Sequence, residues 1–189
     1  MIAAISASGR PGSNSTALLE SALSAAAQGG AIARHDLASI SFQGCTGCSG
    51  CRKGAPGCVL KDDLTPVLAD VARASAVIIS GPVYYGYVSG IMKSFLDRWY
   101  GFKDAERNLR MPSGRKLLAL IAQGHPDEKA YERMTDELER VYAAYGFRPV
   151  TLVGAGLEAP GSAFTLPDLL KRAFDLGHGL AADADWPAS

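Results

Sequence analysis

The chain has 189 residues, of which 48% are hydrophobic and 20% are charged, and its 19 basic side chains balance 19 acidic ones. This length and apolar content predict one compact domain with its own core, and they exclude a disordered chain. Zero net charge argues against a nucleic-acid-binding protein, which normally carries a basic excess.

Short apolar runs alternate with longer segments of helical periodicity along the chain. Glycine, proline and serine bound many of the apolar runs, and these residues commonly interrupt secondary structure. In chain order the pattern predicts a strand at 2–7, a helix at 15–27, a strand at 31–37, a helix at 62–73, a strand at 76–80, a helix at 89–99, a strand at 116–122, a helix at 127–145, a strand at 149–153 and a helix at 166–176.

Continuous apolar strands that alternate with helices are typical of a parallel sheet covered on both faces. The pattern predicts a doubly wound α/β fold of the flavodoxin type, with a five-stranded sheet in the order 2-1-3-4-5 and helices on both faces. A small Rossmann half fits the same pattern. In either fold, ligands bind where the loops leave the carboxyl ends of the strands, so a site is expected at 8–14, 81–88 and 123–126.

The segment 8–16 joins the first predicted strand to the first predicted helix, and it is rich in hydroxyl and amide side chains. Free backbone N–H groups and the helix dipole favour an anion at such a helix start, so the segment is a candidate phosphate site. The candidate phosphate ligands are Ser8, Arg10, Ser13, Asn14 and Ser15. An ordinary capped turn would use the same residues. The segment lacks the Gly-Lys-[Ser/Thr] sequence of an ATP-binding P-loop.

A second glycine-rich stretch, at 154–159, matches the G-x-G-x-x-A dinucleotide-binding pattern directly after the last predicted strand. That pattern needs a helix to begin within it, because the pyrophosphate binds at the helix N-terminus. Pro160 and Gly161 follow where the helix should begin. We therefore expect no dinucleotide at this stretch.

All four cysteines lie close together in the sequence, in the spacing C-x2-C-x2-C-x6-C: Cys45, Cys48, Cys51 and Cys58. Glycines between them allow the chain to turn, so that the thiolates can surround one small metal core. The spacing favours a [4Fe-4S] cluster over a zinc ribbon, which splits its ligands into two distant pairs. The alternatives are a reduced buried loop and a disulfide formed on purification.

The third predicted strand is followed by an aromatic loop at 81–90, and the fourth is followed by a small polar loop at 123–126. A planar apolar ligand with a polar edge would find aromatic faces and backbone N–H groups in the first of these loops, and a histidine in the second. The candidate contacts are Pro82, Val83, Tyr84, Tyr85, Gly86, Gln123, Gly124 and His125.

Between residue 2 and roughly residue 155, the sequence resembles the NADPH-dependent FMN reductase family of flavodoxin fold. The first loop of that family reads G-S-x-R-x-x-S-N-T, and residues 7–15 follow it with Ala7 for Gly and Ser15 for Thr. The family's S-P-V-Y-x-G-x-x-S signature is matched by 81–89, with Gly81 in first place, and continues as K-x-F-L-D-R at 93–98. The iron-sulfur flavoprotein branch adds a compact four-cysteine motif before two aspartates, as in 45–63.

The resemblance implies a single FMN-binding domain over 1–189 that acts as an NAD(P)H-dependent oxidoreductase. FMN would place its phosphate at 8–15 and its isoalloxazine ring between 82–87 and 123–125, and no residue would be needed as a catalytic acid or base. Electrons would pass to a flavin, a quinone or another acceptor, with a [4Fe-4S] cluster as a single-electron carrier where one is bound. A non-enzymatic FMN electron carrier and a thiol-based redox sensor are the alternatives.

The resemblance also implies a homodimer or homotetramer, with Trp99 and Tyr100 as candidate interface residues. Trp99 shares a face of the helix predicted at 89–99 with Phe95, so the core is the alternative place for it. The expected partner is a small-molecule or protein electron acceptor, and neither nucleic acid nor a membrane is expected. No apolar run approaches the roughly 18 residues of a membrane span. The first residues lack the basic stretch of a signal peptide, so a cytoplasmic location is expected.

Overall fold

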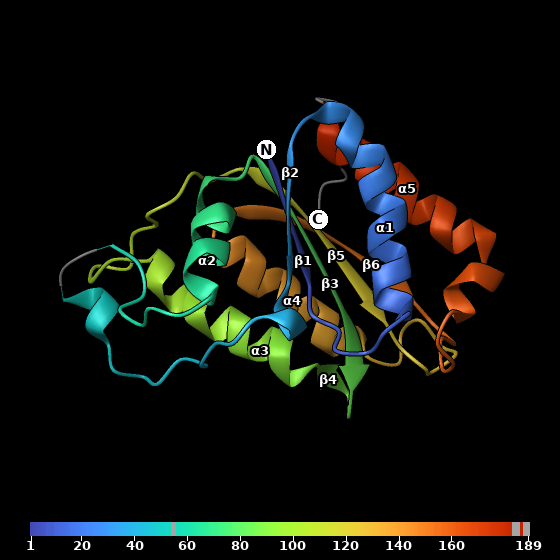
Figure 1. The fold of residues 1–189 in the computed structure, drawn as a ribbon, viewed down its shortest axis with the longest axis horizontal. Coiled ribbons are helices and arrows are strands. Elements are labelled where there is room, and N and C mark those ends of the chain that lie inside the picture. Colours follow the sequence, from blue (N-terminus) through green and yellow to red (C-terminus); the bar gives the residue numbers. More distant parts are fainter. Residues whose placement is uncertain (54–55, 183–185, 187–189) are drawn as a thin grey trace.

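The computed structural model describes residues 1–53, 56–182 and 186. A β-sheet lies at the centre of the fold, between two layers of helices (Figure 1). Within these residues the strands are β1 (Ile2–Ser6), β2 (Ile32–Asp36), β3 (Ala76–Tyr84), β4 (Tyr87–Val88), β5 (Arg115–Ala122) and β6 (Phe147–Gly154). Every pairing is parallel except that of β4, which lies antiparallel to β3. The strand order β2-β1-β3-β5-β6 is the predicted order 2-1-3-4-5 with the short β4 set aside, so the predicted fold is confirmed.

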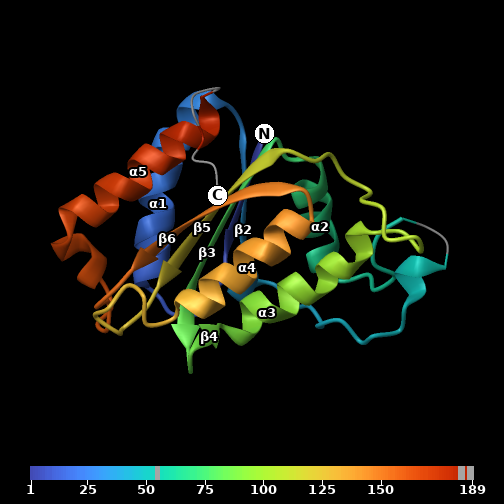
Figure 2. The same cartoon turned by 180° about the vertical axis from the view of Figure 1, so that it is seen from behind.

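Helices cover both faces of the sheet, as Figures 1 and 2 show. One face carries α1 (Asn14–Ala26) and α5 (Pro167–Ala181), and the other carries α2 (Leu64–Arg73), α3 (Gly90–Asp97) and α4 (Glu132–Ala144). The side chains of the central strands alternate between two hydrophobic cores, one under each layer of helices. This burial on both faces explains why the strands read as continuous apolar runs. In the described ranges, no helix is both long enough and apolar enough to cross a membrane.

The helix predicted at 127–145 begins later, at Glu132. The residues before it form turns that Gln123 holds, because its Nε2 donates to the carbonyls of His125 and Asp127 at 3.3 and 2.7 Å. The backbone N–H of Asp127 also donates to His125 Nδ1 at 3.1 Å. These local bonds compete with helical ones, so the segment before Glu132 stays outside the helix.

The helix predicted at 166–176 runs further, from Pro167 to Ala181, although it contains two glycines. Gly177 lies so close to α1 that a Cβ atom there would come within 2.1 Å of the Ala22 carbonyl oxygen. Only glycine permits this approach, and the packing of α5 on α1 offsets the low helix propensity of glycine. The helix therefore continues where the sequence alone indicates a stop.

The strand predicted at 76–80 continues through Gly81 and Pro82 and turns back into β4. The two residues of this turn, Tyr85 and Gly86, have φ values of 50° and 78°, as a two-residue type I′ hairpin requires.

Asn tolerates positive φ better than Tyr, and the Tyr85 side chain is fully exposed. We expect Tyr85→Asn to raise the free energy of unfolding by about 0.5–1 kcal/mol in urea denaturation; a loss of stability would contradict this assignment of the turn.

Candidate functional site

The carboxyl ends of β1, β3, β5 and β6 open on a cavity of about 170 Å³. It lies at the edge where doubly wound sheets bind their ligands. Its lining residues are Ser8, Arg10, Ser13, Asn14, Ser15, Pro82, Val83, Tyr84, Ala122, Gly124, Leu157 and Glu158. The cavity thus joins the three loops that the sequence predicted with a fourth loop, after β6, that it did not.

The first turn of α1 presents hydrogen-bond donors to this cavity. Ser13 caps the helix, because its Oγ accepts the backbone N–H of Thr16 at 3.2 Å. The same Oγ lies 2.7 Å from Thr16 Oγ1 and 3.3 Å from Ser15 Oγ, so three hydroxyl groups cluster at the helix start. Backbone N–H groups of a first helical turn have no partner within the helix, and the helix dipole adds positive potential there. The arrangement suits a phosphate group.

Asn14 links this first turn to the loop after β6. Its Nδ2 donates to the carbonyls of Leu157 and Ala159 at 3.1 and 2.8 Å, and its Oδ1 accepts the N–H of Ala163 at 3.0 Å. The Asn14 side chain is buried and engaged in these three bonds. It therefore holds the fourth loop against the cavity, and its backbone N–H is what it can offer a ligand.

Arg10 is the cation of the cavity lining. Its Nη1 donates to the Glu158 carbonyl at 3.4 Å, and its backbone N–H donates to Ser8 Oγ at 3.3 Å. A guanidinium has five N–H donors, so one contact to a carbonyl leaves most of them for an anion. Arg10 is exposed, which places the cation at the mouth of the cavity.

Ser89 fixes the aromatic loop against the end of β1, although it does not line the cavity. It caps α3 by accepting the N–H of Met92 at 3.3 Å, and its hydroxyl donates to the Ala7 carbonyl at 2.9 Å. Gly81 allows close packing beside it, since a Cβ there would come within 2.7 Å of Met92 Cε. The serine that ends the 81–89 signature therefore brings two loops of the cavity together.

The predicted contacts to a planar ligand divide into two groups. Pro82, Val83, Tyr84 and Gly124 line the cavity, whereas Tyr85, Gly86, Gln123 and His125 lie outside its lining. The ring of His125 meets that of Tyr131 edge-on, with centroids 6.2 Å apart, and Gly86 lies against the same tyrosine. Gln123 is 2% exposed, and its Oε1 has no hydrogen-bond partner among the described residues. Tyr85, Gly86 and His125 form a rim where the β3–β4 hairpin meets the 123–131 loop, and Gln123 is buried within that loop.

The described parts of the cysteine segment, 42–53 and 56–61, lie at the opposite end of the molecule from α1 (Figures 1 and 2). All four cysteines line one small hollow of about 20 Å³, whose wall also includes Arg98, Tyr100 and Gly101. Cys45 and Cys48 are exposed, Cys58 is half-buried and Cys51 is buried. The four cysteines therefore border one hollow, and a cluster held by them stays a prediction.

The thiols of this hollow differ in their electrostatic environment. A backbone hydrogen bond from Gly50 and a side-chain bond from Thr46 lower the pKa of the Cys48 thiol, whereas burial raises the pKa of Cys51. Within residues 1–53, 56–182 and 186, no three Cys, His, Asp or Glu side chains converge as a metal-binding group. The donor set therefore suits a metal cluster, but the side chains are not arranged on one centre.

Arg98 ties both ends of the cysteine segment to the core. Its Nη1 donates to the Gln43 carbonyl at 2.7 Å, and its Nη2 donates to the Leu60 carbonyl at 3.2 Å. The same two nitrogens donate to the Asp62 carboxylate at 2.8 and 3.2 Å. The Arg98 side chain is fully buried, and its hydrogen bond holds the pKa of Asp62 below its usual range. Sequence reasoning matched both residues to a family motif but assigned them no role.

Of the two places predicted for Trp99, the core is confirmed and a subunit interface is wrong, because Trp99 is fully buried within the chain. Its ring lies 5.6–5.8 Å from those of its aromatic neighbours, Phe95, Phe102, Tyr142, Tyr145 and Phe147. An aromatic residue at the end of an amphipathic helix has the same sequence signal whether it faces the core or a partner. Tyr100 is 43% exposed and remains a candidate interface residue.

Comparisons of sequence place these loops in a known family. The sequence model of the NADPH-dependent FMN reductase family matches residues 1–157. An iron-sulfur flavoprotein of Archaeoglobus fulgidus is 32% identical over 173 residues, which are 89% of this chain and 73% of that protein. A second iron-sulfur flavoprotein, from Methanocaldococcus jannaschii, is 36% identical over 95 residues, which are 50% of this chain and 49% of that protein.

Solved structures share the fold. An NAD(P)H:quinone oxidoreductase from Methanothermobacter marburgensis has a TM-score of 0.77 at 20% identity, over 97% of this chain and 98% of that one. An FMN-dependent NADH-azoreductase from Bacillus anthracis, solved in complex with FMN, has a TM-score of 0.71 at 13% identity, over 96% of this chain and 99% of that one. Together with the match over residues 1–157, the relative at 32% identity shows that the chain is an oxidoreductase of the NADPH-dependent FMN reductase family.

Proposed function

We propose that the cavity at the carboxyl edge of the sheet binds FMN with its phosphate at the N-terminus of α1, and that residues 1–189 act as one FMN-binding domain. The observation that carries the proposal is the meeting of the α1 N-terminus with three other loops around one cavity. The hydroxyls of Ser8, Ser13 and Ser15 and the backbone N–H of Asn14 would bind the phosphate oxygens. The guanidinium of Arg10 would neutralise part of the charge.

The isoalloxazine ring would lie over Pro82, Val83 and Tyr84 on one side and Gly124 on the other. The rim residues Tyr85, Gly86 and His125 would contribute backbone and edge contacts. Gln123 holds the 123–127 loop in place through its two bonds to carbonyls, so its part is to position that loop. When bound, FMN supplies the redox chemistry, because it accepts a hydride from NAD(P)H and passes the electrons to an acceptor. The chain's own residues bind and orient, and we assign none of them as a catalytic acid or base.

NAD(P)H is the proposed electron donor, and a flavin, a quinone or another carrier is the proposed acceptor. The quinone oxidoreductase and azoreductase names of structural neighbours support small-molecule acceptors. The site is open to such a molecule at the hairpin, where Tyr84 is 51% exposed and Tyr85 is fully exposed. A homodimer or homotetramer is proposed as the working form, with Tyr100 at its interface.

The proposed flavin chemistry is tested by anaerobic mixing of the FMN-loaded protein with NADPH and, separately, with NADH. We expect the absorbance of oxidised flavin to disappear within seconds of mixing with one of the two, and to return when a quinone is added. A protein that retains FMN but is reduced by neither nucleotide would be an electron carrier rather than a reductase. A protein that takes up no FMN would remove the proposal altogether.

A [4Fe-4S] cluster is the proposed occupant of the cysteine hollow, held by Cys45, Cys48, Cys51 and Cys58. The donor set fits by its chemistry, because four thiols border one hollow and thiolates are the ligands of such clusters. The thiols would have to draw together around the cluster, since in the described residues they do not converge on one centre. The names of the two curated relatives also support it. When bound, the cluster supplies one-electron transfer.

Replacement of Cys51 by Ser should remove this cluster without removing FMN, because the hollow shares no lining residue with the cavity at the carboxyl edge of the sheet. We expect anaerobic reconstitution with iron and sulfide to load the wild type with about four irons per chain, and to load Cys51→Ser with far less. Ser49→Ala, in the same hollow, is the matched control and should load like the wild type. Equal iron contents in wild type and Cys51→Ser would contradict the ligand assignment.

A further inference from the structure

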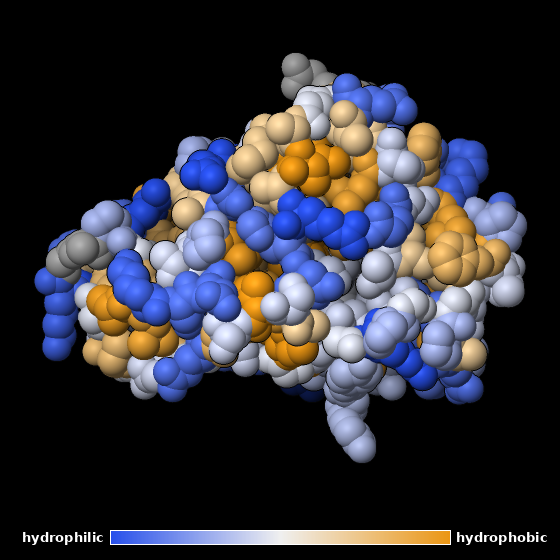
Figure 3. Space-filling model, viewed as in Figure 1, coloured by the Kyte–Doolittle hydropathy of each residue, from blue (hydrophilic) through white to orange (hydrophobic). Residues whose placement is uncertain are grey.

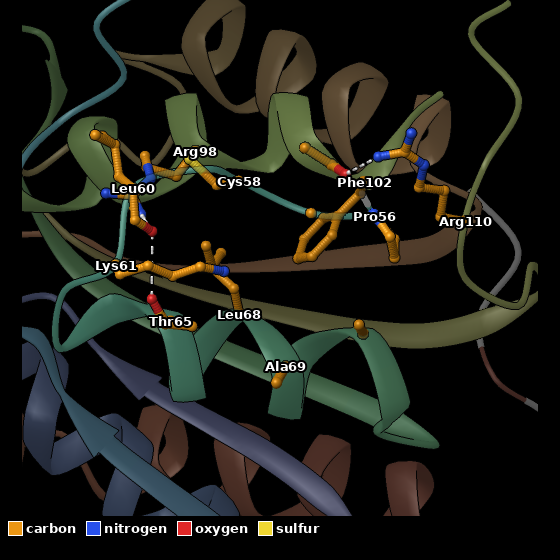
Figure 4. A pocket seen from close by; sticks show the side chains of 13 residues that line it. Pro56, Cys58, Leu60, Lys61, Thr65, Leu68, Ala69, Arg98, Phe102 and Arg110 are labelled. Carbon is orange, nitrogen blue, oxygen red and sulfur yellow. Dashed lines mark hydrogen bonds between the residues drawn. The ribbon is translucent and has the colours of Figure 1, made fainter. Parts of the chain in front are cut away.

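A second cavity, of about 250 Å³, lies between the cysteine segment and α2. It shares no lining residue with the cavity at the carboxyl edge of the sheet. Figure 4 shows Leu68 and Ala69 of α2 along one side and Phe102 and Arg110 on the other. The side chain of Lys61 lies at the end near Thr65, away from Arg110. The space has a built wall on each side, contributed by segments far apart in the sequence.

The lining combines an apolar surface with positive charge. Leu60, Leu68, Ala69, Ala72 and Phe102 supply the apolar part. Three cations complete it, Lys61, Arg98 and Arg110, and no carboxylate lies among the described residues of the lining. Figure 3 shows hydrophobic residues, in orange, beside hydrophilic ones, in blue, on the left of the view, where Figure 1 places α2 and the cysteine segment. An occupant with an apolar body and one anionic group matches this lining.

The cations differ in how much of their hydrogen-bonding capacity the protein uses. Arg98 binds Asp62 and two carbonyls, yet its Nε is buried without a partner among the described residues. Arg110 donates through Nη1 to the carbonyls of Cys51 and Gly101, at 3.0 and 3.4 Å. Lys61 is exposed and stands at the mouth. Lys61 and Arg110 are therefore the groups that can pair with an anion entering from solvent.

From this lining we propose that the cavity binds a small aromatic carboxylate. The ring would pack between Leu68 and Phe102, and the carboxylate would pair with Lys61 at the exposed end of the cavity. An apolar cavity of about 150 Å³ can bind benzene, so a cavity of about 250 Å³ has room for a single substituted ring. The proposal does not depend on FMN binding.

Occupancy of this cavity would affect the cysteine hollow directly. The two spaces share Cys58, Leu60, Arg98 and Gly101 in their walls. A Cβ on Gly101 would come within 2.8 Å of the Cys58 backbone nitrogen, so the segment is packed closely there. A bound ring would therefore restrain the cysteine segment against α2, and slower hydrogen exchange at 56–61 and 64–73 would report it.

The probe is 4-fluorobenzoate, and its binding to the full chain is measured by fluorine NMR. Saturating FMN is present, so that the cavity at the carboxyl edge of the sheet is already occupied. We expect saturable binding that slows exchange at 56–61 and 64–73 and not at 8–15. Lys61→Glu should weaken it about tenfold, since attraction becomes repulsion. Ala69→Trp, which fills the cavity from an exposed helix position, should abolish it. Lys129→Glu is the matched charge control, and 4-fluorobenzyl alcohol is the neutral control, expected to bind at least about tenfold more weakly.

Several outcomes would overturn the proposal: no saturable binding, binding that neither Lys61→Glu nor Ala69→Trp changes, or equal affinity for the neutral alcohol. Protection at 8–15 instead of at 56–73 would place the probe elsewhere and would overturn it too. Because Lys61 is exposed, Lys61→Glu keeps the test decisive even if Ala69→Trp fails to fold. Failure of FMN binding is seen separately in the flavin absorbance, so the two proposals are judged independently.

Discussion

Ser13→Asp should weaken FMN binding by about 100-fold or more, whereas Ser13→Asn should change it only a few-fold. Asp and Asn are nearly equal in size, and both are strong helix N-caps, so both variants keep the role that Ser13 plays for the Thr16 N–H. Only Asp adds a negative charge to the buried end of the cavity, where it would repel the phosphate. The measurement is the dissociation constant for FMN, obtained from quenching of flavin fluorescence.

Two controls accompany this pair. The affinity for riboflavin, which lacks the phosphate, should be the same in Ser13→Asp and Ser13→Asn. Their free energies of unfolding should agree within about 1 kcal/mol, because the cap is preserved. Equal FMN affinities in the two variants would mean that the phosphate lies away from α1.

Arg98→Met should lower the free energy of unfolding by about 3–5 kcal/mol, because it leaves the largely buried Asp62 carboxylate without its cation. The carbonyls of Gln43 and Leu60 also lose their donors, so both ends of the cysteine segment are released. Urea denaturation gives the stability, and limited proteolysis should show faster cleavage within 42–61. The control is Arg34→Met, which breaks the half-exposed pair with Glu20 and should cost less than about 1 kcal/mol. Equal losses in the two variants would contradict the role of Arg98.

The same ion pair predicts a pH dependence. Since the pKa of Asp62 is lower in the folded chain than in the unfolded one, its stabilisation is complete above the unfolded value of about 3.9 and is lost as the pH falls through the folded value. The stability gap between wild type and Arg98→Met should therefore be constant above about pH 5 and narrow in more acid solution. A gap that widens in acid would mean that Asp62 is not the partner whose charge matters.

The strand order could be predicted because β1, β3, β5 and β6 are short apolar runs separated by helical segments, and that pattern admits few topologies. The ends of elements were harder to predict, since tertiary contacts set them. Gly177 reads as a helix breaker, yet α5 continues through it because the helix packs against Ala22. The start of α4 is set by the side chain of Gln123, a residue well outside the helix.

The candidate site also has parts that the sequence predicts and parts that only the tertiary structure reveals. The loop at 8–15 was predictable because a helix start rich in hydroxyl groups has a local sequence signal. The contribution of Leu157 and Glu158 could not be predicted from the sequence. It depends on three hydrogen bonds that the Asn14 side chain makes to residues about 145 positions away in the sequence. The glycine-rich stretch at 154–159 was the available signal, because a loop after the last parallel strand must leave the same edge of the sheet. The buried position of Trp99 likewise depends on aromatic partners from α4 and β6.

The most direct test of the account compares FMN with riboflavin on the purified, flavin-free wild-type chain. Backbone N–H groups, hydroxyls and Arg10 around the α1 N-terminus should make FMN bind at least about 100-fold more tightly than riboflavin, with the difference shrinking as salt is raised. Equal affinities for the two flavins would contradict the account, because the first helix would then contribute nothing to recognition of the phosphate.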